Sequence, residues 1–121
     1  MIKKPFIIFS FIFFIMSCGG DESSTNEVVL PQNPTIITDK TSISFDDTMV
    51  SKSSSASSVL IESKNVDSSL NISSSDGFEI SLNNLDFSNS LTIEANQSKT
   101  IYVRFSPSKI QTYNGNINIQ N

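Results

Sequence analysis

The sequence predicts an all-β protein, an antiparallel β-sandwich of about seven strands. Apolar and polar residues alternate with a period of two over several short segments, most clearly at residues 78–82 and 99–105. Turn-forming residues separate these segments at intervals of roughly 8 to 12 residues, as they do in sandwiches. No long segment after Cys18 places its apolar residues at helical spacing. Two antiparallel sheets packed face to face are therefore the expected architecture.

The expected strands follow one another from Pro34 onward. The first two are short, and the serine-rich run at 51–58 after them is expected to be a loop or a polar strand edge. Turns are expected at 74–77, at 95–98 and at Asn114-Gly115. The predicted strands include residues 36–37, 43–45, 59–61, 70–72, 78–82, 91–93, 99–105 and 116–120.

The alternation also predicts which side chains face the space between the sheets. Either the chain is a truncated fragment or the strand at 116–120 is the terminal one; if it is terminal, we expect it to close its sheet against the strand at 101–105. The predicted core consists of Ile43, Phe45, Val59, Ile61, Leu70, Ile72, Phe78, Ile80, Leu91, Ile93, Ile101, Val103, Phe105, Ile117 and Ile119.

The N-terminal segment has a different pattern from the rest of the chain. Lys3 and Lys4 precede a run at 6–16 that is apolar apart from one serine, and Ser17 and Cys18 close it. Basic, apolar and small residues in this order are typical of a secretory signal peptide. As a helix, at about 1.5 Å per residue, the run would cover roughly half of the hydrocarbon core of a bilayer. A cleaved signal peptide at 1–17 is therefore favoured over a retained anchor helix.

Residues 15–18 resemble the lipobox of bacterial lipoproteins, which has an aliphatic residue, a tolerant position, a small residue and a cysteine. The resemblance implies that diacylglycerol is attached to the thiol of Cys18 and that a signal peptidase cuts between Ser17 and Cys18. The new amine can then receive a fatty acid such as palmitate. Two or three acyl chains hold a protein durably on a membrane, whereas one is marginal. Cleavage without lipidation is the alternative.

The chain after the signal peptide divides into a tether and one domain. Residues 18–33 are mostly small, polar or acidic, which predicts a flexible tether, and residues 34–121 are too few for two domains. Gly19 stands where an aspartate would signal inner-membrane retention in enterobacterial lipoproteins. Asp21 and Glu22 resemble the export signal of Bacteroidetes surface lipoproteins. These resemblances imply a lipid-anchored location at the outer membrane or cell surface.

Four segments, at 76–80, 95–98, 103–107 and 113–119, together resemble the second half of an immunoglobulin-like domain. The family is the abnormal-spindle and hydin (ASH) type, related to major sperm protein and to bacterial choice-of-anchor D modules. The resemblance covers about residues 34–121 and implies an immunoglobulin-like sandwich that acts as a binding, spacer or scaffold module. Ala95-Asn96 replaces the family's Pro-Gly turn, which asparagine permits because it tolerates the left-handed conformation.

The composition offers little for catalysis. The chain has no histidine, which excludes Ser-His and Cys-His catalysis and histidine-bound metals, and its one cysteine is assigned to lipid. A net charge of −4 argues against nucleic acid as a partner. We therefore expect no enzymatic activity, cofactor or metal. Glycoside hydrolysis needs two carboxylates that face each other across a cleft. The spacing of the acidic residues does not require such a pair among Asp46, Asp47, Asp67, Asp76, Glu79 and Asp86.

Three further features are weaker site candidates. Residues 86–90 faintly resemble a calcium loop, but the central glycine is missing and Gln97 stands where a bidentate glutamate belongs. Thr48 lies in a tripeptide similar to the O-glycosylation sequon of Bacteroidetes exported proteins. Tyr102 and Tyr113 could line a ligand surface, although tyrosine in such sandwiches usually packs at a sheet edge or corner.

These observations favour a lipid-anchored cell-envelope protein whose domain is a non-enzymatic adhesion, scaffold or assembly module. Its membrane contact is expected through Cys18, and its other partner is an unidentified protein or glycan. The alternative is a carbohydrate-binding surface lipoprotein that holds a glycan on an exposed sheet face or at the loop tips. A hydrolase is disfavoured by the residue inventory.

Overall fold

The structure, a computed structural model, describes residues 6–11 and 32–121. This part of the chain is all-β and forms a sandwich of two sheets, as the sequence predicts. It contains no helix long and apolar enough to cross a membrane. The nine strands are β1 (Phe6–Phe11), β2 (Thr35–Thr38), β3 (Ser42–Ser44), β4 (Ser57–Lys64), β5 (Leu70–Ser74), β6 (Phe78–Ser81), β7 (Ser90–Ile93), β8 (Ser98–Phe105) and β9 (Asn114–Gln120).

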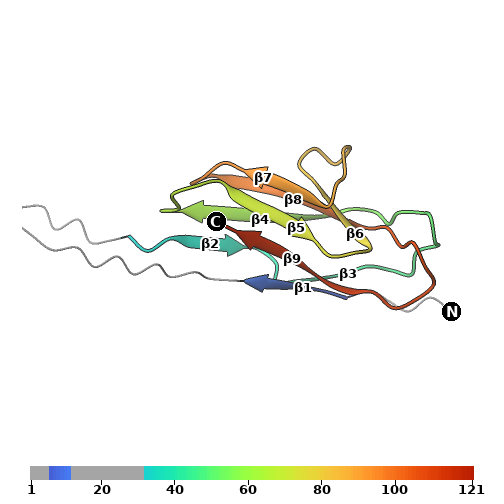
Figure 1. Cartoon of the computed structure of the whole chain (residues 1–121). Coiled ribbons are helices and arrows are strands. Elements are labelled where there is room, and N and C mark those ends of the chain that lie inside the picture. Colours follow the sequence, from blue (N-terminus) through green and yellow to red (C-terminus); the bar gives the residue numbers. More distant parts are fainter. Residues whose placement is uncertain (1–5, 12–31) are drawn as a thin grey trace, which may run out of the picture.

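The two sheets differ in how their strands pair. One has four strands in the order β2-β4-β8-β6, and each neighbouring pair is antiparallel. The other has five strands in the order β3-β1-β9-β5-β7. In this second sheet β1 runs antiparallel to β3 but parallel to β9, the one parallel pair among the described strands. The strands of both sheets run along the long axis of the domain (Figure 1).

The core lies between the sheets, where the alternation predicts it. All of the predicted core residues are buried except Leu91, which is partly buried and packs against the others. At the centre the rings of Phe45, Phe78 and Phe105 lie with centroids 5.4 to 6.4 Å apart. The structure adds Val66 to this core. Each fully buried apolar side chain contributes about 1.5 to 3 kcal/mol of transfer free energy, so the predicted core accounts for the packing of the sheets.

The partner of the last strand differs from the prediction. The sequence analysis paired residues 116–120 with the strand at 101–105. In the structure β9 lies in the other sheet, between β1 and β5, whereas β8 pairs with β4 and β6. The prediction is wrong because alternation fixes which side chains face the core and carries no information about which strands are neighbours.

The predicted turn at Asn114-Gly115 is also wrong, because both residues lie within β9. The glycine serves close packing instead of a turn. A Cβ atom at Gly115 would lie 2.7 Å from Cβ of Ser75 and 2.9 Å from Cε2 of Phe78. The turn at 95–98 does form, and Asn96 takes a φ of 57°, as its tolerance of the left-handed region led us to expect.

Candidate interaction site

Tyr113 fixes the start of β9. Its phenol oxygen accepts hydrogen bonds from the backbone N–H groups of Ser108 at 3.2 Å and Lys109 at 2.9 Å. Its ring packs edge-on against Phe105, with the centroids 5.3 Å apart, and is 4% exposed. The contact with the Ser108 hydroxyl lowers the pKa of Tyr113 from its ordinary value, and the backbone donors lower it further, against the opposing effect of burial. Tyr113 therefore packs at a corner of the sandwich, and its bond back to the backbone just upstream is the geometry of the tyrosine corner in immunoglobulin-like sandwiches.

In the immunoglobulin arrangement such a tyrosine stands at the start of strand F, the position that Tyr113 takes before β9. The order β2-β4-β8-β6 then corresponds to strands A-B-E-D, and β5 corresponds to strand C beside F. In that arrangement strand G lies beside F on the side away from C. In this structure β1 takes that place, because it lies beside β9 on the side away from β5.

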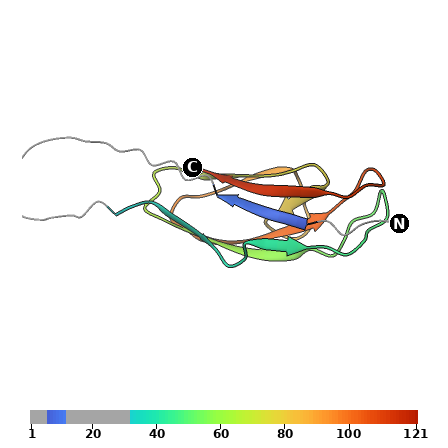
Figure 2. The ribbon, with the colours of Figure 1, turned by 90° about the horizontal axis from the view of Figure 1, so that it is seen from below.

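β1 pairs along its whole length with β9. Phe6 lies opposite Asn114 at one end of this ladder, and Phe11 lies opposite Ile119 at the other. Figure 2 shows β1 in blue beside β9 in red. On its other side β1 pairs with all of β3, from Phe6 opposite Ser44 to Ile8 opposite Ser42. Among the described strands, β3 joins its sheet through β1 alone.

The sequence analysis did not anticipate β1, since it assigned residues 6–11 to the signal peptide and began the domain at residue 34. The assignment of residues 1–17 to a signal peptide stays a prediction. Ser17 and Cys18, the predicted cleavage and lipidation site, lie outside the described residues. What the structure adds is that a six-residue segment from this region fits between β3 and β9.

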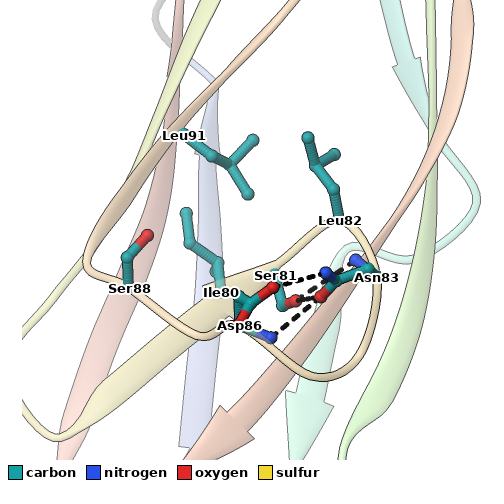
Figure 3. Close-up of a pocket in the computed structure, with 7 residues that line it drawn as sticks. All are labelled: Ile80, Ser81, Leu82, Asn83, Asp86, Ser88 and Leu91. Carbon is teal, nitrogen blue, oxygen red and sulfur yellow. Dashed lines mark hydrogen bonds between the residues drawn. The ribbon is translucent and has the colours of Figure 1, made fainter.

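A small pocket lies where β6 ends (Figure 3). The loop after β6 returns to the sheet through two backbone hydrogen bonds between Ile80 and Ser88, of 2.8 and 2.9 Å. Within the loop, Oδ1 of Asn83 accepts from the N–H groups of Leu85 and Asp86, and its amide donates to the Asp86 carboxylate at 2.7 Å. The carboxylate at the start of the faint calcium motif therefore has a partner inside the loop. Within residues 6–11 and 32–121, no three His, Cys, Asp or Glu residues cluster as a metal site would need.

Thr48, the predicted glycosylation site, lies in a polar groove after β3. Its hydroxyl donates to the carbonyl of Asp46 at 3.0 Å. The groove has a volume of about 380 Å³. Apart from Phe45, it is lined by groups that carry hydroxyls or carboxylates: Ser44, Asp46, Asp47, Thr48, Ser54, Ser55 and Ser57. Asp46 and Asp47 are the predicted carboxylates that the structure brings into one site, while O-glycosylation of Thr48 stays a prediction.

The outer face of β6 and β8 carries an ion pair that the sequence did not reveal. Arg104 binds Glu79 through Nε at 2.7 Å and through a terminal nitrogen at 2.6 Å, and its guanidinium lies 4.0 Å above the ring of Phe87. The pair follows from the register of β6 and β8, which places Glu79 opposite Arg104. Both side chains are about 30% exposed, so the ion pair lies at the surface of the domain.

No protein-family model, curated protein or solved structure matches this chain.

Proposed function

We propose that the chain is a lipid-anchored cell-envelope protein whose immunoglobulin-like domain acts as a non-enzymatic adhesion, scaffold or assembly module. The observation that carries the proposal is the N-terminal order of residues: two lysines, an apolar run, and a lipobox-like segment at 15–18 that ends in Cys18. A polar, acidic tether follows, and then one β-sandwich. This order supports a folded domain that a short flexible tether holds near a membrane surface.

The end of the sandwich that carries the groove also presents apolar side chains to solvent. Met49, in the loop between β3 and β4, is 69% exposed, and Ile110, in the loop between β8 and β9, is 74% exposed. A hydrogen bond of 3.1 Å from Ser51 N–H to the Pro107 carbonyl ties the two loops together. Exposed apolar side chains on adjoining loops suit contact with another macromolecule, which supports an adhesive or assembling role.

Mass spectrometry of the protein extracted from membranes tests the anchor. We expect an N-terminal peptide that begins at Cys18 and carries diacylglycerol, with or without an additional acyl chain. The matched control is Cys18→Ala, which should lose both the lipid and the cleavage. An unmodified chain in the soluble fraction would contradict the proposal.

The second candidate function is glycan binding, and the groove around Thr48 is the observation that favours it. Its hydroxyls and carboxylates are the groups that bind sugar hydroxyls. A glycan array with the mature protein is the test, with Asp47→Asn as the paired variant. We expect the variant to lose any signal that this groove produces. An array without hits removes this candidate.

A further inference from the structure

We propose that the place of β1 between β3 and β9 is an acceptor lane for an apolar β-strand of a partner protein. The inference rests on the proposed function, because cleavage before Cys18 removes all of β1 (Phe6–Phe11) from the mature protein. It also deepens that function, since it states how the domain would assemble with a partner.

The lane has the width of one strand. Neighbouring strands lie about 4.8 Å apart, so β3 and β9, which both pair with β1, lie about 10 Å from one another. This separation is too large for direct backbone hydrogen bonds between them. Loss of β1 would therefore open a gap inside the sheet, with the unpaired backbone edge of β3 on one side and that of β9 on the other.

The lane lies over the core. With β1 in place, Ile117 and Ile119 of β9 are 0% and 4% exposed, and Ile43 of β3 is 6% exposed. Phe45, just after β3, packs against the central aromatic rings. Opening the lane would bring water close to these side chains and to the backbone edge of β9. Strand edges of this kind pair readily with extended segments of other chains, and the newly paired backbone provides affinity.

The lane defines the chemistry of its occupant. The segment seated in it is six residues long, Phe-Ile-Ile-Phe-Ser-Phe, and its positions 9 and 11 lie opposite Ile117 and Ile119, the buried isoleucines of β9. It runs parallel to β9 and antiparallel to β3. The partner should therefore supply an extended segment of about six residues in this direction, with apolar residues at the alternate positions that face the core.

A second copy of the mature chain is a poor donor of this strand. Its tether has a single apolar run, residues 28–30, which is half of the length required. The apolar segments at 32–121 already form β2 to β9 and the core between the sheets. No segment of residues 18–121 is left to fill the lane, so we place the donor in a partner polypeptide.

The test uses the mature lipoprotein, purified from membranes in detergent, and a peptide of residues 3–11 whose lysines keep it soluble. We expect one peptide per chain by native mass spectrometry. We also expect at least tenfold slower amide exchange in β3 and β9, with β4 and β8 unchanged as the internal reference. The control peptide carries Ile8→Pro, which has similar apolar character but removes a backbone donor in the middle of the strand. It should give neither binding nor protection.

A photo-crosslinking group at position 11 of the peptide tests the direction of binding. Parallel pairing places it near Ile119, and a crosslink near Asn114 would overturn the assignment. A folded mature protein that ignores the peptide, or that binds the proline variant equally, also overturns the proposal. So does a monomer whose β3 and β9 amides are fully protected without peptide, because the lane is then filled by its own polypeptide.

The same sample separates this proposal from the proposed function. A lipid on Cys18 without peptide binding refutes the acceptor lane and leaves the lipoprotein intact. An uncleaved chain that retains residues 1–17 refutes both proposals, since β1 would then stay in its place.

Discussion

The two sheets of the sandwich are built from different sources. The sheet β2-β4-β8-β6 draws all its strands from residues 35–105, and each strand pairs antiparallel with its neighbours. The sheet β3-β1-β9-β5-β7 depends at one point on residues 6–11, the segment that we predict to be removed with the signal peptide. One sheet is therefore complete within the predicted domain, and the other is complete only with a strand from outside it. The predictions that follow probe this difference, from the largest expected effect to the smallest.

Removal of β9 should have a much larger effect than removal of β1. A chain that ends at Tyr113 loses Ile117 and Ile119, and each deleted buried aliphatic side chain costs about 2 to 5 kcal/mol in a domain whose total stability is only about 5 to 15 kcal/mol. It should not fold as a monomer. A chain from Gln32 to Asn121 should unfold cooperatively, because it keeps the four-stranded sheet and also β9 with its neighbours β5 and β7. Denaturant melts of the two chains decide this, and a similar midpoint for the chain ending at Tyr113 would contradict it.

The same difference should appear between two matched core substitutions. Ile101 in β8 and Ile117 in β9 are both completely buried, so Ile101→Ala and Ile117→Ala should each destabilise the whole chain by about 2 to 5 kcal/mol. In the chain that starts at Gln32, the effect of Ile117→Ala should shrink, because the β9 edge can relax into the open lane. Urea melts measure all four free energies. An undiminished effect of Ile117→Ala would show that the lane closes when β1 is absent.

The connection between the sheets should be sensitive to a single methyl group. Gly77 has a φ of 86°, and a Cβ atom there would lie 2.4 Å from Cδ1 of Tyr113. Gly77→Ala should cost about 1 to 3 kcal/mol from overpacking alone, with additional strain from the left-handed backbone. The expected result in a thermal melt is a clearly lower midpoint. An unchanged midpoint would mean that the tyrosine corner moves freely.

The hydroxyl of the tyrosine corner should contribute less than the ring. Tyr113→Phe keeps the contact with Phe105 but removes the acceptor for the N–H groups of Ser108 and Lys109. Because both donors lie on an exposed loop that water can reach, the loss should be about 0.5 to 1.5 kcal/mol. Tyr113→Ala is the reference for loss of the ring, and it should destabilise the domain several times more.

The smallest effect is expected on the outer face of the four-stranded sheet. The pair of Glu79 and Arg104 is partly exposed, so Glu79→Gln should cost less than about 1 kcal/mol. The difference should decrease further when salt is added, because salt screens exposed charges. A loss that is larger than this and independent of salt would show that the contact of Arg104 with Phe87 depends on the ion pair.

The sequence predicted the sandwich and its buried faces because alternation reports burial directly. Ile101, Val103 and Phe105 show this clearly, since their spacing alone places them inside. Val66 was missed because it stands alone between Asn65 and Asp67. Its burial depends on Asn96, whose side chain bonds both the N–H and the carbonyl of Val66 at 2.9 and 3.0 Å. A contact between residues so far apart leaves no periodic signal.

The place of β1 could not be predicted for a related reason. An unbroken apolar run is compatible with a signal helix and with a strand buried in a sheet, and periodicity cannot distinguish the two. The lane itself depends on the order of the strands in the sheet, and that order is set by pairing between strands that are far apart in the sequence. The sequence did contain a sign of the corner, since Tyr113 directly precedes the last strand. The sequence contained no sign that the ring of Tyr113 contacts Phe105 at the other end of the loop between β8 and β9.

The parallel direction of β1 has a mechanical consequence. The end of β9 and the entry of the tether lie at one end of the domain, where Asn121 bonds Ser68 and Asn65 bonds Asn33. A strand that runs parallel to β9 has its amino end at the opposite, outer end. Tension between the anchor and that amino end would load every hydrogen bond of the ladder at once, in shear, whereas tension on the carboxyl end would peel the bonds one at a time. If the domain is anchored through Cys18 and accepts a partner strand, as we propose, it would resist a partner that pulls away from the membrane and release one that pulls toward it.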